Sequence, residues 1–451
     1  MRRHEDDRHV SFIATDRELA RRSYYAATAQ RTQDFAALQG SVECDVAVVG
    51  AGLAGLSAAI ELADRGRRVA LLEAEQVGWA ASGRNGGQAI AGLACDQAAV
   101  ESLVSLDEAK RIWAMTLEAL DIIRERRERF AIDCDWQPGY LAAAVTAKKG
   151  RELQQWQETM ARVYGFETEW IAPGELPRWL ASPRFHSALH DPRGGHLHPL
   201  KYCLGLADAA SRLGVQIHER SPVIELDTAA AKPRLRTARG EVRAEQVLLA
   251  GNVYVQGIAP ALGARIMPVG TYMVASEALD PALARSLIPS RAAVSDTNFV
   301  LDYFRFAPDH RLLFGGLISY STATPRHLER SMQRRMAATF PPLQNTAVEF
   351  AWGGFVDISM NRAPDFGRLS AVTADGRRPG LANVYYVQGF SGHGLALTGL
   401  AGRVVAEAMA GDAGRFDTFA RIRHRAFPGG RLLRTPALVA GMAYYRLRDL
   451  L

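Results

Sequence analysis

The chain has 451 residues, of which 48% are hydrophobic and 23% are charged, and its formal net charge is +6. This length and composition are typical of a soluble globular protein with a large core. Only five of the basic residues are lysines, and the arginines are spread along the whole sequence. A nucleic-acid-binding protein carries a localised basic stripe, so we expect no nucleic-acid partner.

The cysteines show no spacing that indicates a disulfide framework or a metal site. Cys44, Cys95, Cys134 and Cys203 lie far apart and form neither a CxxC motif nor a Cys/His ligand pattern. Residues 1–22 lack the apolar core of a secretory signal, and no apolar stretch is long enough to span a bilayer. We therefore expect a cytoplasmic protein without a transmembrane segment or a bound metal.

The first informative region follows a polar stretch, residues 1–43, that we expect to wrap the surface as a lead-in. An apolar run over 46–49 leads into a GAGLAG sequence and a helical stretch, and a second apolar run ends at Glu73. This order predicts a βαβ dinucleotide-binding unit. Its glycines let backbone amides approach a pyrophosphate at a helix N-terminus, and Glu73 can accept hydrogen bonds from ribose hydroxyls. The residues of this predicted site are Gly50, Ala51, Gly52, Leu53, Ala54, Gly55, Glu73 and Ala74.

A second glycine-rich segment, SGRNGGQ over 82–88, follows soon after Glu73. It indicates a cofactor that is longer than the nucleotide and whose far end needs close backbone approach. FAD fits this pattern better than NAD. The residues predicted to contact it are Ser82, Arg84, Asn85, Gly86, Gly87 and Gln88.

The rest of the chain alternates between two textures. Residues 97–190 read as helices around a strand, and the βα rhythm returns after residue 191, with a buried-strand run over 247–249 that ends at Gly251. Residues 265–344 show short alternating strands, which predict an antiparallel sheet. A second strand, glycine turn and helix unit then covers residues 384–409, and its amides point at another acceptor.

These patterns predict an α/β fold with two interleaved domains. We expect a Rossmann-like FAD-binding domain of the glutathione-reductase type, interleaved with a substrate domain built on an antiparallel sheet. The FAD-binding domain is predicted over 44–96, 191–264 and 345–425. The substrate domain is predicted over 97–190 and 265–344. Residues 426–451 form a C-terminal tail that we expect to dock as a final helix in preference to lying on a membrane.

The ordered set GAGLAG with Glu73, SGRNGGQ, GGHLHP over 194–199 and GFSGHG over 389–394 resembles the FAD-dependent D-amino-acid oxidase superfamily, in its glycine oxidase and sarcosine oxidase branch. The chain is most similar to the gamma-glutamylputrescine oxidases of that superfamily. Those proteins share further stretches with it, namely Ser23-Tyr24-Tyr25, Met267-Pro268-Val269, Trp352-Gly353-Gly354 and Asn361-Arg362. The likeness covers nearly the full length.

The resemblance implies where FAD would bind. The first glycine turn and Glu73 would hold the ADP half, Val223 would contact the adenine through its backbone, and Arg84 to Gln88 would lie along the isoalloxazine. The turn before the last helix would place amides at the flavin pyrimidine edge, where negative charge grows on reduction. Its residues are Gly389, Gly392, His393, Gly394 and Leu395.

Two departures from the family pattern bear on the cofactor. Monomeric sarcosine oxidases tether FAD through a cysteine in the C-terminal half, but this chain has no cysteine after Cys203. The tryptophan-histidine tether of the dimethylglycine dehydrogenases is replaced around Trp79-Ala80-Ala81. FAD is therefore expected to bind noncovalently. The monomeric sarcosine oxidases also use a lysine over the flavin to help oxygen react. No lysine follows Lys232 in this chain, which leaves both oxygen and an electron carrier open as the acceptor.

The family chemistry is hydride transfer from the carbon beside an amine nitrogen to flavin N5, which gives an imine that water splits into an aldehyde and an amine. The catalytic candidates are His393, Trp352 and Tyr303, with Phe304 and Phe390 as further aromatic walls. Since neighbouring residues on a strand face opposite sides, only one of Tyr303 and Phe304 can face the flavin. Arg305 and Arg362 are candidates for binding a substrate carboxylate, and His198 before Pro199 is read as a turn residue.

The expected function is oxidation of a small-molecule amine, with a gamma-glutamylated polyamine as the favoured substrate and polyamine catabolism as the setting. Oxygen is the favoured acceptor, with hydrogen peroxide as product. One alternative is an FAD-dependent dehydrogenase or oxidase of an N-substituted or D-amino acid, such as sarcosine or glycine. A protein that binds a flavin or dinucleotide without catalysis is the alternative from another class.

Overall fold

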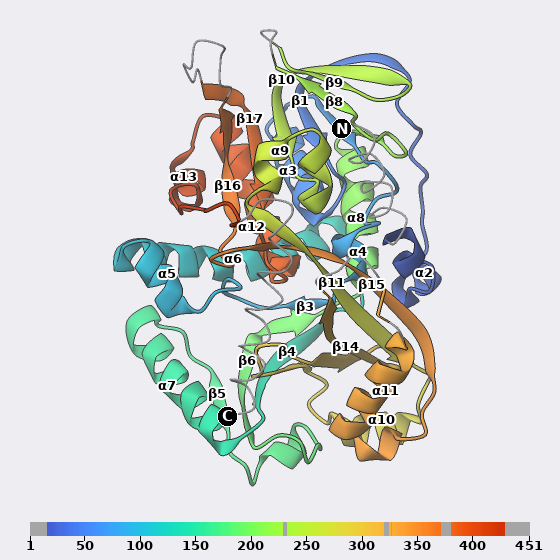
Figure 1. Ribbon diagram of the computed structural model, residues 1–451, viewed down its shortest axis with the longest axis vertical. Coiled ribbons are helices and arrows are strands. Elements are labelled where there is room, and N and C mark those ends of the chain that lie inside the picture. Colours follow the sequence, from blue (N-terminus) through green and yellow to red (C-terminus); the bar gives the residue numbers. More distant parts are fainter. Residues whose placement is uncertain (1–15, 229–231, 320–323, 326, 371–379, 429–451) are drawn as a thin grey trace.

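The computed structural model describes residues 16–228, 232–319, 324–325, 327–370 and 380–428. Within these ranges the chain forms two β-sheets, one in the upper half of Figure 1 and one in the lower half, with helices around both. None of the helices in these ranges is long and apolar enough to cross a membrane. The first 15 residues of the predicted lead-in, and residues 429–451 of the predicted tail, lie outside the described residues.

The first sheet has a parallel core in the order β17-β10-β1-β2-β7. β16 extends it as an antiparallel edge strand beside β17, and β9 pairs with both β10 and β8. The central strands are apolar and buried on both faces, as parallel strands covered on both sides must be. The bounds are β1 Gly40–Val49, β2 Val69–Leu72, β7 Gln216–His218, β8 Glu225–Asp227, β9 Arg234–Arg236, β10 Gly240–Leu249, β16 Asp365–Ser370 and β17 Gly380–Gln388.

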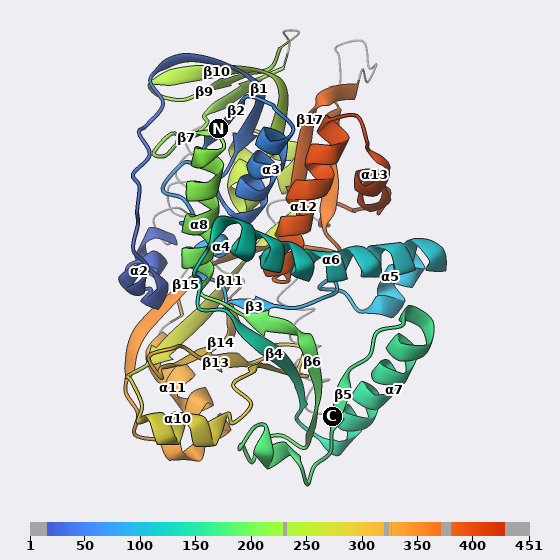
Figure 2. The ribbon, with the colours of Figure 1, turned by 180° about the vertical axis from the view of Figure 1, so that it is seen from behind.

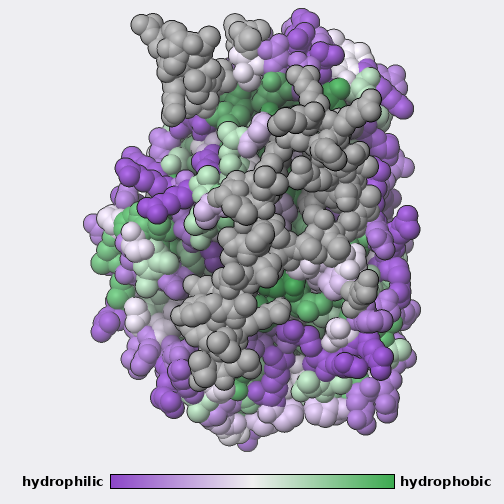
Figure 3. All heavy atoms as spheres, viewed as in Figure 1, coloured by the Kyte–Doolittle hydropathy of each residue, from purple (hydrophilic) through white to green (hydrophobic). Residues whose placement is uncertain are grey.

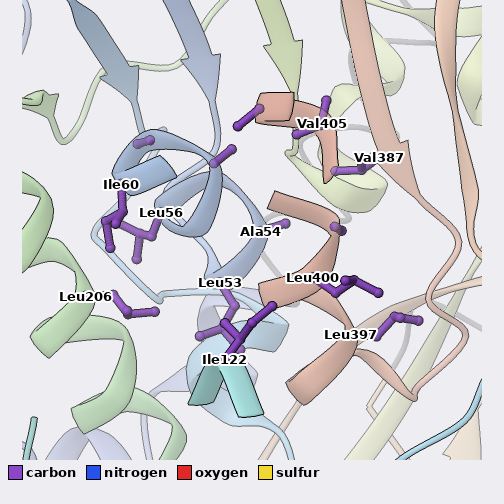
Figure 4. Close-up of a cluster of buried hydrophobic side chains, with 14 of the residues drawn as sticks. Leu53, Ala54, Leu56, Ile60, Ile122, Leu206, Val387, Leu397, Leu400 and Val405 are labelled. Atoms are coloured by element: carbon purple, nitrogen blue, oxygen red, sulfur yellow. The ribbon is translucent and has the colours of Figure 1, made fainter. Parts of the chain in front are cut away.

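Four helices cover the first sheet on the face seen in Figure 2. Of these, α3 and α12 are buried nearly all round, since almost every side chain on them is apolar and small or aliphatic. Figure 4 shows their side chains meeting those of α6 and α8 in one cluster. Burying each large aliphatic side chain contributes about 1.5–3 kcal/mol, so this cluster is the main core of the molecule. The bounds are α3 Leu53–Asp64, α6 Leu106–Phe130, α8 Pro199–Arg212 and α12 Gly394–Met409, with α13 Gly414–Ala420 following α12.

The second sheet runs in the order β15-β11-β14-β13-β12-β4-β6-β3, with β5 beside β6. All pairs are antiparallel except β12 with β4. The strand bounds are β3 Gln88–Ala89, β4 Gln137–Ala144, β5 Glu169–Ile171, β6 Ser187–His196, β11 Ile266–Ser276, β12 Ala293–Asp296, β13 Tyr303–Phe306, β14 Leu312–Ser319 and β15 Val348–Ser359. The helices of this half are α5 Gln97–Leu103, α7 Ala147–Tyr164, η1 Leu176–Arg178, α10 Pro281–Leu287, α11 Leu328–Thr339 and η3 Pro341–Leu343.

The mixed α/β architecture is as predicted, but four stretches pack with a different sheet from the one that the predicted domain boundaries imply. β15 pairs with β11 along its length, so residues 348–359 belong to the second sheet and not to the unit predicted from 345. β3 and the end of β6 also pair in the second sheet. α6 contributes its apolar stripe to the core of the first sheet, although its sequence was assigned to the substrate domain.

The polar lead-in is not a surface wrap throughout. Helix α2, Tyr24–Thr28, begins after Ser23, whose hydroxyl accepts from Ala26 N at its N-terminus. Tyr24 and Tyr25 are both buried, and the Tyr25 ring lies 5.2 Å from that of Trp352. The lead-in therefore contributes aromatic side chains to the core beside the second sheet.

Candidate active site

The glycine turn after β1 is set by backbone contacts that leave no room for a side chain. Gly50 has φ +106°, and a Cβ there would lie 2.8 Å from Ala250 O. A Cβ on Gly55 would lie 1.9 Å from Gly50 O. Gly52, the N-cap of α3, supplies no side-chain cap, but Leu53 N donates to Ser82 Oγ over 3.0 Å. The turn and the start of the second glycine-rich segment are therefore in direct contact.

Glu73 follows β2 and faces the same turn. Its Oε2 accepts from Ala51 N at 2.8 Å and its Oε1 accepts from Glu75 N at 3.0 Å. Burial raises the pKa of Glu73 to about 6, against the lowering effect of these two backbone hydrogen bonds. Ser221 N donates to Glu73 O, which brings the segment that contains Val223 beside this carboxylate.

Between the two sheets lies a cavity of 770 Å³, within the usual range for small-molecule sites. Three predicted segments reach it, namely the start of α3, the glycine-rich segment that contains helix α4 (Ala81–Arg84), and the turn before α12. The second sheet closes the other side. The predicted residues that line it are Leu53, Ser82, Arg84, Asn85, Gly86, Gln88, Tyr303, Gly392, His393, Gly394 and Leu395.

The other predicted residues do not line this cavity. Most of them belong to the glycine turn after β1 and its neighbours. Gly251 is one of these neighbours, since a Cβ on Gly50 would lie 3.0 Å from Gly251 Cα. Their predicted contacts with a nucleotide remain predictions. These residues are Gly50, Ala51, Gly52, Ala54, Gly55, Glu73, Ala74, Gly87, Val223, Gly251, Gly389 and Trp352.

Arg84 is fixed on the cavity wall by a buried ion pair with Asp16. Its Nη1 and Nη2 donate to the two carboxylate oxygens of Asp16 over 2.8 and 3.0 Å, and Nη1 also donates to Gly353 O. The guanidinium lies 4.7 Å from the ring centre of Trp79, and Tyr254 in η2, Asn252–Gly257, donates its hydroxyl to Asp16. The predicted cavity residue is therefore held by the lead-in, a partner that no motif indicates.

The residues after Arg84 link the glycine-rich segment to the second sheet. Gln88 donates through Nε2 to Val294 O over 2.9 Å and accepts from Ser295 Oγ over 3.1 Å. A Cβ on Gly86 would lie 2.7 Å from the Tyr303 ring, so glycine permits this ring to approach the backbone. The segment is thus held against β12 and β13.

The aromatic candidates separate into cavity and core residues. Tyr303 lines the cavity, whereas Phe304 points into the core and stacks on Phe314 at 5.5 Å, as the alternation of a strand requires. Trp352 differs from our expectation of a wall residue. It is fully buried outside the cavity lining, and its Nε1 donates to Arg84 O over 3.0 Å, so it supports the backbone of the glycine-rich segment.

His393 lies at the N-cap of α12 and lines the cavity. Burial lowers its pKa, which favours the neutral imidazole at pH 7, and Nε2 lies 3.0 Å from Ala91 O, which assigns the Nε2–H tautomer. The side chain of the N-cap residue does not cap α12, and the first residues of the helix, Gly394, Leu395 and Ala396, line the cavity. Three N–H groups of the turn before α12 have protein acceptors: Gly389 N donates to Asp357 Oδ2, Ser391 N to Asp357 O and His393 N to Phe390 O.

The structure separates the remaining polar candidates. Arg305 is buried and donates to Gly86 O, Leu197 O and the Tyr25 hydroxyl, which is a supporting role. His198 accepts from Lys201 N at the start of α8, in agreement with its reading as a turn residue. Arg362 lines the cavity, and its guanidinium lies 5.4 Å from the Phe299 ring centre.

Three cavity features were missed by sequence reasoning. Asp296 and Asp357 line the cavity as buried carboxyls on β12 and β15. An acidic residue inside an apolar strand is the signal that marks them. Phe299, Leu301 and Met360 also line the cavity and remain part-exposed. Hydrophilic side chains follow much of the outline of the molecular face in Figure 3. No group of three or more metal-ligating side chains occurs within the described residues.

Comparison with known proteins gives the family. Residues 45–408 match the family model described as FAD dependent oxidoreductase. The chain is 42% identical over 428 residues to the gamma-glutamylputrescine oxidoreductase of Escherichia coli K12, covering 95% of this chain and 98% of that one. It is 26% identical to the glycine oxidase of Geobacillus kaustophilus, covering 84% of this chain and 97% of the other.

Solved structures show the same fold. The crystal structure of the Geobacillus kaustophilus glycine oxidase aligns with a TM-score of 0.66 at 22% identity, over 82% of this chain and 95% of that one. The L-amino acid deaminase of Proteus vulgaris aligns with a TM-score of 0.69 at 18% identity, over 88% of this chain and 99% of the other. The chain therefore belongs to the FAD-dependent oxidoreductases of the D-amino-acid oxidase family.

Proposed function

We propose that this protein binds FAD noncovalently and oxidises the carbon–nitrogen bond of a gamma-glutamylputrescine-like amine, with oxygen as the acceptor. The observation that carries the proposal is the meeting of three separated glycine-containing segments at one cavity. The 42% identity to gamma-glutamylputrescine oxidoreductase over nearly the whole chain supports the substrate class.

The residues present fit FAD. The glycine turn after β1 leaves no space for a Cβ at Gly50 or Gly55, and the first amides of α3 and α12 lie at helix N-termini, which favour anionic and electron-rich groups. The turn and Glu73 would hold the ADP half, and α4 with the start of α12 would hold the ring. When bound, FAD supplies an acceptor for the electron pair that leaves the substrate. No cysteine occurs among the described residues that line the cavity, which supports noncovalent binding.

The chain's own contribution to the reaction is to orient a neutral amine in a dry site. Deprotonating an ammonium with a pKa near 10.4 at pH 7 costs about 5 kcal/mol. Apolar walls lower this cost because they disfavour the charged form. Tyr303, Val356, Leu317 and Phe390 line the cavity and supply such walls. His393 is neutral, and burial makes its protonation cost free energy.

Arg362 is the residue that we propose to recognise the glutamyl end of the substrate. It lines the cavity beside the part-exposed Phe299, so its guanidinium can meet a carboxylate at the rim. A gamma-glutamyl amine carries its carboxylate far from the reacting carbon, and the 770 Å³ cavity has room for such an elongated ligand beside the cofactor ring. Sarcosine and glycine, the smaller alternatives, have their carboxylate next to the reacting carbon.

The acceptor and the compartment are further parts of the proposal. No lysine occurs among the described residues that line the cavity, so an electron carrier remains the alternative to oxygen. Hydrogen peroxide formed per amine consumed in air separates the two. The four cysteines are free, which agrees with the reducing cytoplasm that we propose as the location.

Anaerobic bleaching of the yellow holoprotein tests the proposed function. We expect gamma-glutamylputrescine to bleach the flavin band faster than putrescine, sarcosine, glycine or D-amino acids. Bleaching by the last three alone would contradict the polyamine substrate. Purified protein that retains no flavin spectrum after incubation with FAD and removal of the unbound FAD would remove every enzymatic reading. Yellow protein that no amine bleaches would favour the binding-only alternative.

A further inference from the structure

Asp357 differs from the other buried carboxyl groups near the cavity. Its residue is 1% exposed and lines the cavity from β15. Other buried carboxyls of the region each form an ion pair: Asp16 with Arg84, Asp296 with Arg184, Asp302 with Arg184 and Arg335, and Asp365 with Arg265. Asp357 forms no ion pair with any described residue. A buried carboxyl without a positive partner favours its protonated form.

Asp357 is fastened to the turn that precedes α12. Its Oδ2 accepts from Gly389 N, and its backbone carbonyl accepts from Ser391 N over 3.0 Å. Ser391 has φ +54°, an uncommon left-handed conformation for a non-glycine residue, and its Oγ accepts from Ser359 N over 3.2 Å. The carboxyl group and the start of α12 are therefore held in a fixed relation.

In this arrangement the Asp357 carboxylate and a reduced cofactor ring would compete for the positive N-terminal end of α12. The partial positive charge at the start of α12 stabilises one negative charge placed near it. The proposed function puts the electron-accepting ring at the same place, where it gains negative charge on reduction. Two anions within a buried site repel each other, so one of them takes up a proton.

We propose that Asp357 is a redox-linked proton site that, at pH values above neutrality, is ionised while the bound cofactor is oxidised and protonated once the cofactor is reduced. This inference rests on the proposed function for its electron source. In that reaction the substrate C–H bond breaks, both of its electrons leave with the hydrogen, and the nitrogen lone pair forms the C=N bond. The protonated imine releases one proton to water, and Asp357 takes one proton from water. When oxygen, the proposed acceptor, takes the electron pair with one hydrogen, Asp357 releases its proton, which balances the second proton of hydrogen peroxide.

The electrostatics of the pocket place this titration near neutral pH. Burial raises the pKa of Asp357 to about 7, the hydrogen bond from Gly389 N lowers it, and the charge of Asp365 raises it. A further negative charge raises it again, so proton uptake on reduction is expected above pH 7. The ionisable groups on the elements packed around β15 and its turn include Arg84 with Asp16, Tyr254, Tyr272, Arg265 with Asp365, Arg362 and His393, and, on the contacting helices α2 and α11, Tyr24, Tyr25, Glu329, Arg330, Arg334 and Arg335.

The test is the pH dependence of the midpoint potential of the holoprotein, reduced chemically so that no amine substrate is needed. Each proton taken up with an electron pair adds about 30 mV per pH unit to the slope. We expect the wild type to be steeper than Asp357→Asn by up to this amount above pH 7. Asp296→Asn, which removes a cavity carboxyl that already has an arginine partner, is expected to keep the steep slope. Equal slopes in the wild type and Asp357→Asn would overturn the proposal.

A measurement on the wild type alone covers the case in which Asp357→Asn does not fold. Reduced-minus-oxidised infrared difference spectra are expected to show a protonated carboxyl band that appears on reduction and shifts in D2O. Absence of that band at pH 8 would overturn the proposal. If the redox-linked proton is found but gamma-glutamylputrescine does not bleach the flavin, the substrate assignment fails and this inference stands.

Discussion

The two glycine turns of the first sheet look alike in sequence but differ in what surrounds their amides. After β1, the turn is wedged between backbone atoms, and its helix receives an outside cap from Ser82. After β17, the turn contains left-handed residues, Gly389, Ser391 and Gly392, and its carboxyl partner Asp357 lines the cavity, whereas Glu73, the carboxyl partner of the first turn, lies outside the cavity lining. Neither carboxyl forms an ion pair with a described residue. The first arrangement suits a ligand group whose charge stays the same during the reaction. The second suits a group whose charge changes.

The largest expected effect comes from the Arg84–Asp16 ion pair, which holds the glycine-rich segment that contacts the first turn. Asp16→Ala leaves a buried guanidinium without its counter-charge, which costs about 3–5 kcal/mol. We expect a loss of this size in the free energy of unfolding, measured by urea denaturation, together with weaker FAD binding. Replacing Asp64, whose pair with Arg129 is part-exposed, is the control and should cost no more than about 1 kcal/mol.

A matched pair of glycine substitutions compares the two turns directly. In Gly55→Ala the new methyl group would lie 1.9 Å from Gly50 O, and overpacking of this kind costs about 3 kcal/mol. In Gly394→Ala the nearest atom, Phe390 Cβ, is 3.3 Å away, so the change in unfolding free energy should stay within about 1 kcal/mol. Equal destabilisation of the two variants would show that the first turn is not the rigid one.

The second turn should show its uncompensated carboxyl in the pH dependence of stability. The pKa of Asp357 is raised to about 7 in the folded protein, above the value of about 3.9 for an unfolded aspartate. Its contribution to stability is therefore fully present below about pH 4 and is lost as the pH rises through about 7. In the FAD-free protein we expect Asp357→Asn to gain stability relative to the wild type between pH 4 and pH 8, by on the order of 4 kcal/mol. Urea denaturation at both pH values measures this, and an equal effect at both would contradict it.

The smallest expected effect concerns the rim of the cavity. Arg362→Ala should raise KM for gamma-glutamylputrescine about tenfold, or about 1.4 kcal/mol, and leave KM for putrescine unchanged because putrescine has no carboxylate. Arg421→Ala, at an exposed arginine outside the cavity lining, is the control. A similar rise for both substrates would mean that Arg362 does not read the glutamyl end.

The sequence predicted what depends on local chain geometry. Glycine turns, the strand that leads to Glu73 and the alternation of Tyr303 and Phe304 follow from backbone sterics and strand periodicity, and these features reappear in the structure. Relations between distant segments were not accessible. The pairing of β15 with β11, the burial of Tyr25 and the Asp16 partner of Arg84 depend on tertiary contacts that no local pattern encodes. Trp352 shows the same limit, since its position beside a glycine pair left a cavity wall and core packing equally open, and the structure buries it outside the cavity lining.

A crystal structure of the protein with FAD bound tests the central claim most directly. The account predicts that the ring lies between the segment from Ser82 to Gln88 and the start of α12, with the adenosine end beside Glu73. A ring bound away from that segment, or an adenosine end that does not approach Glu73, would contradict it.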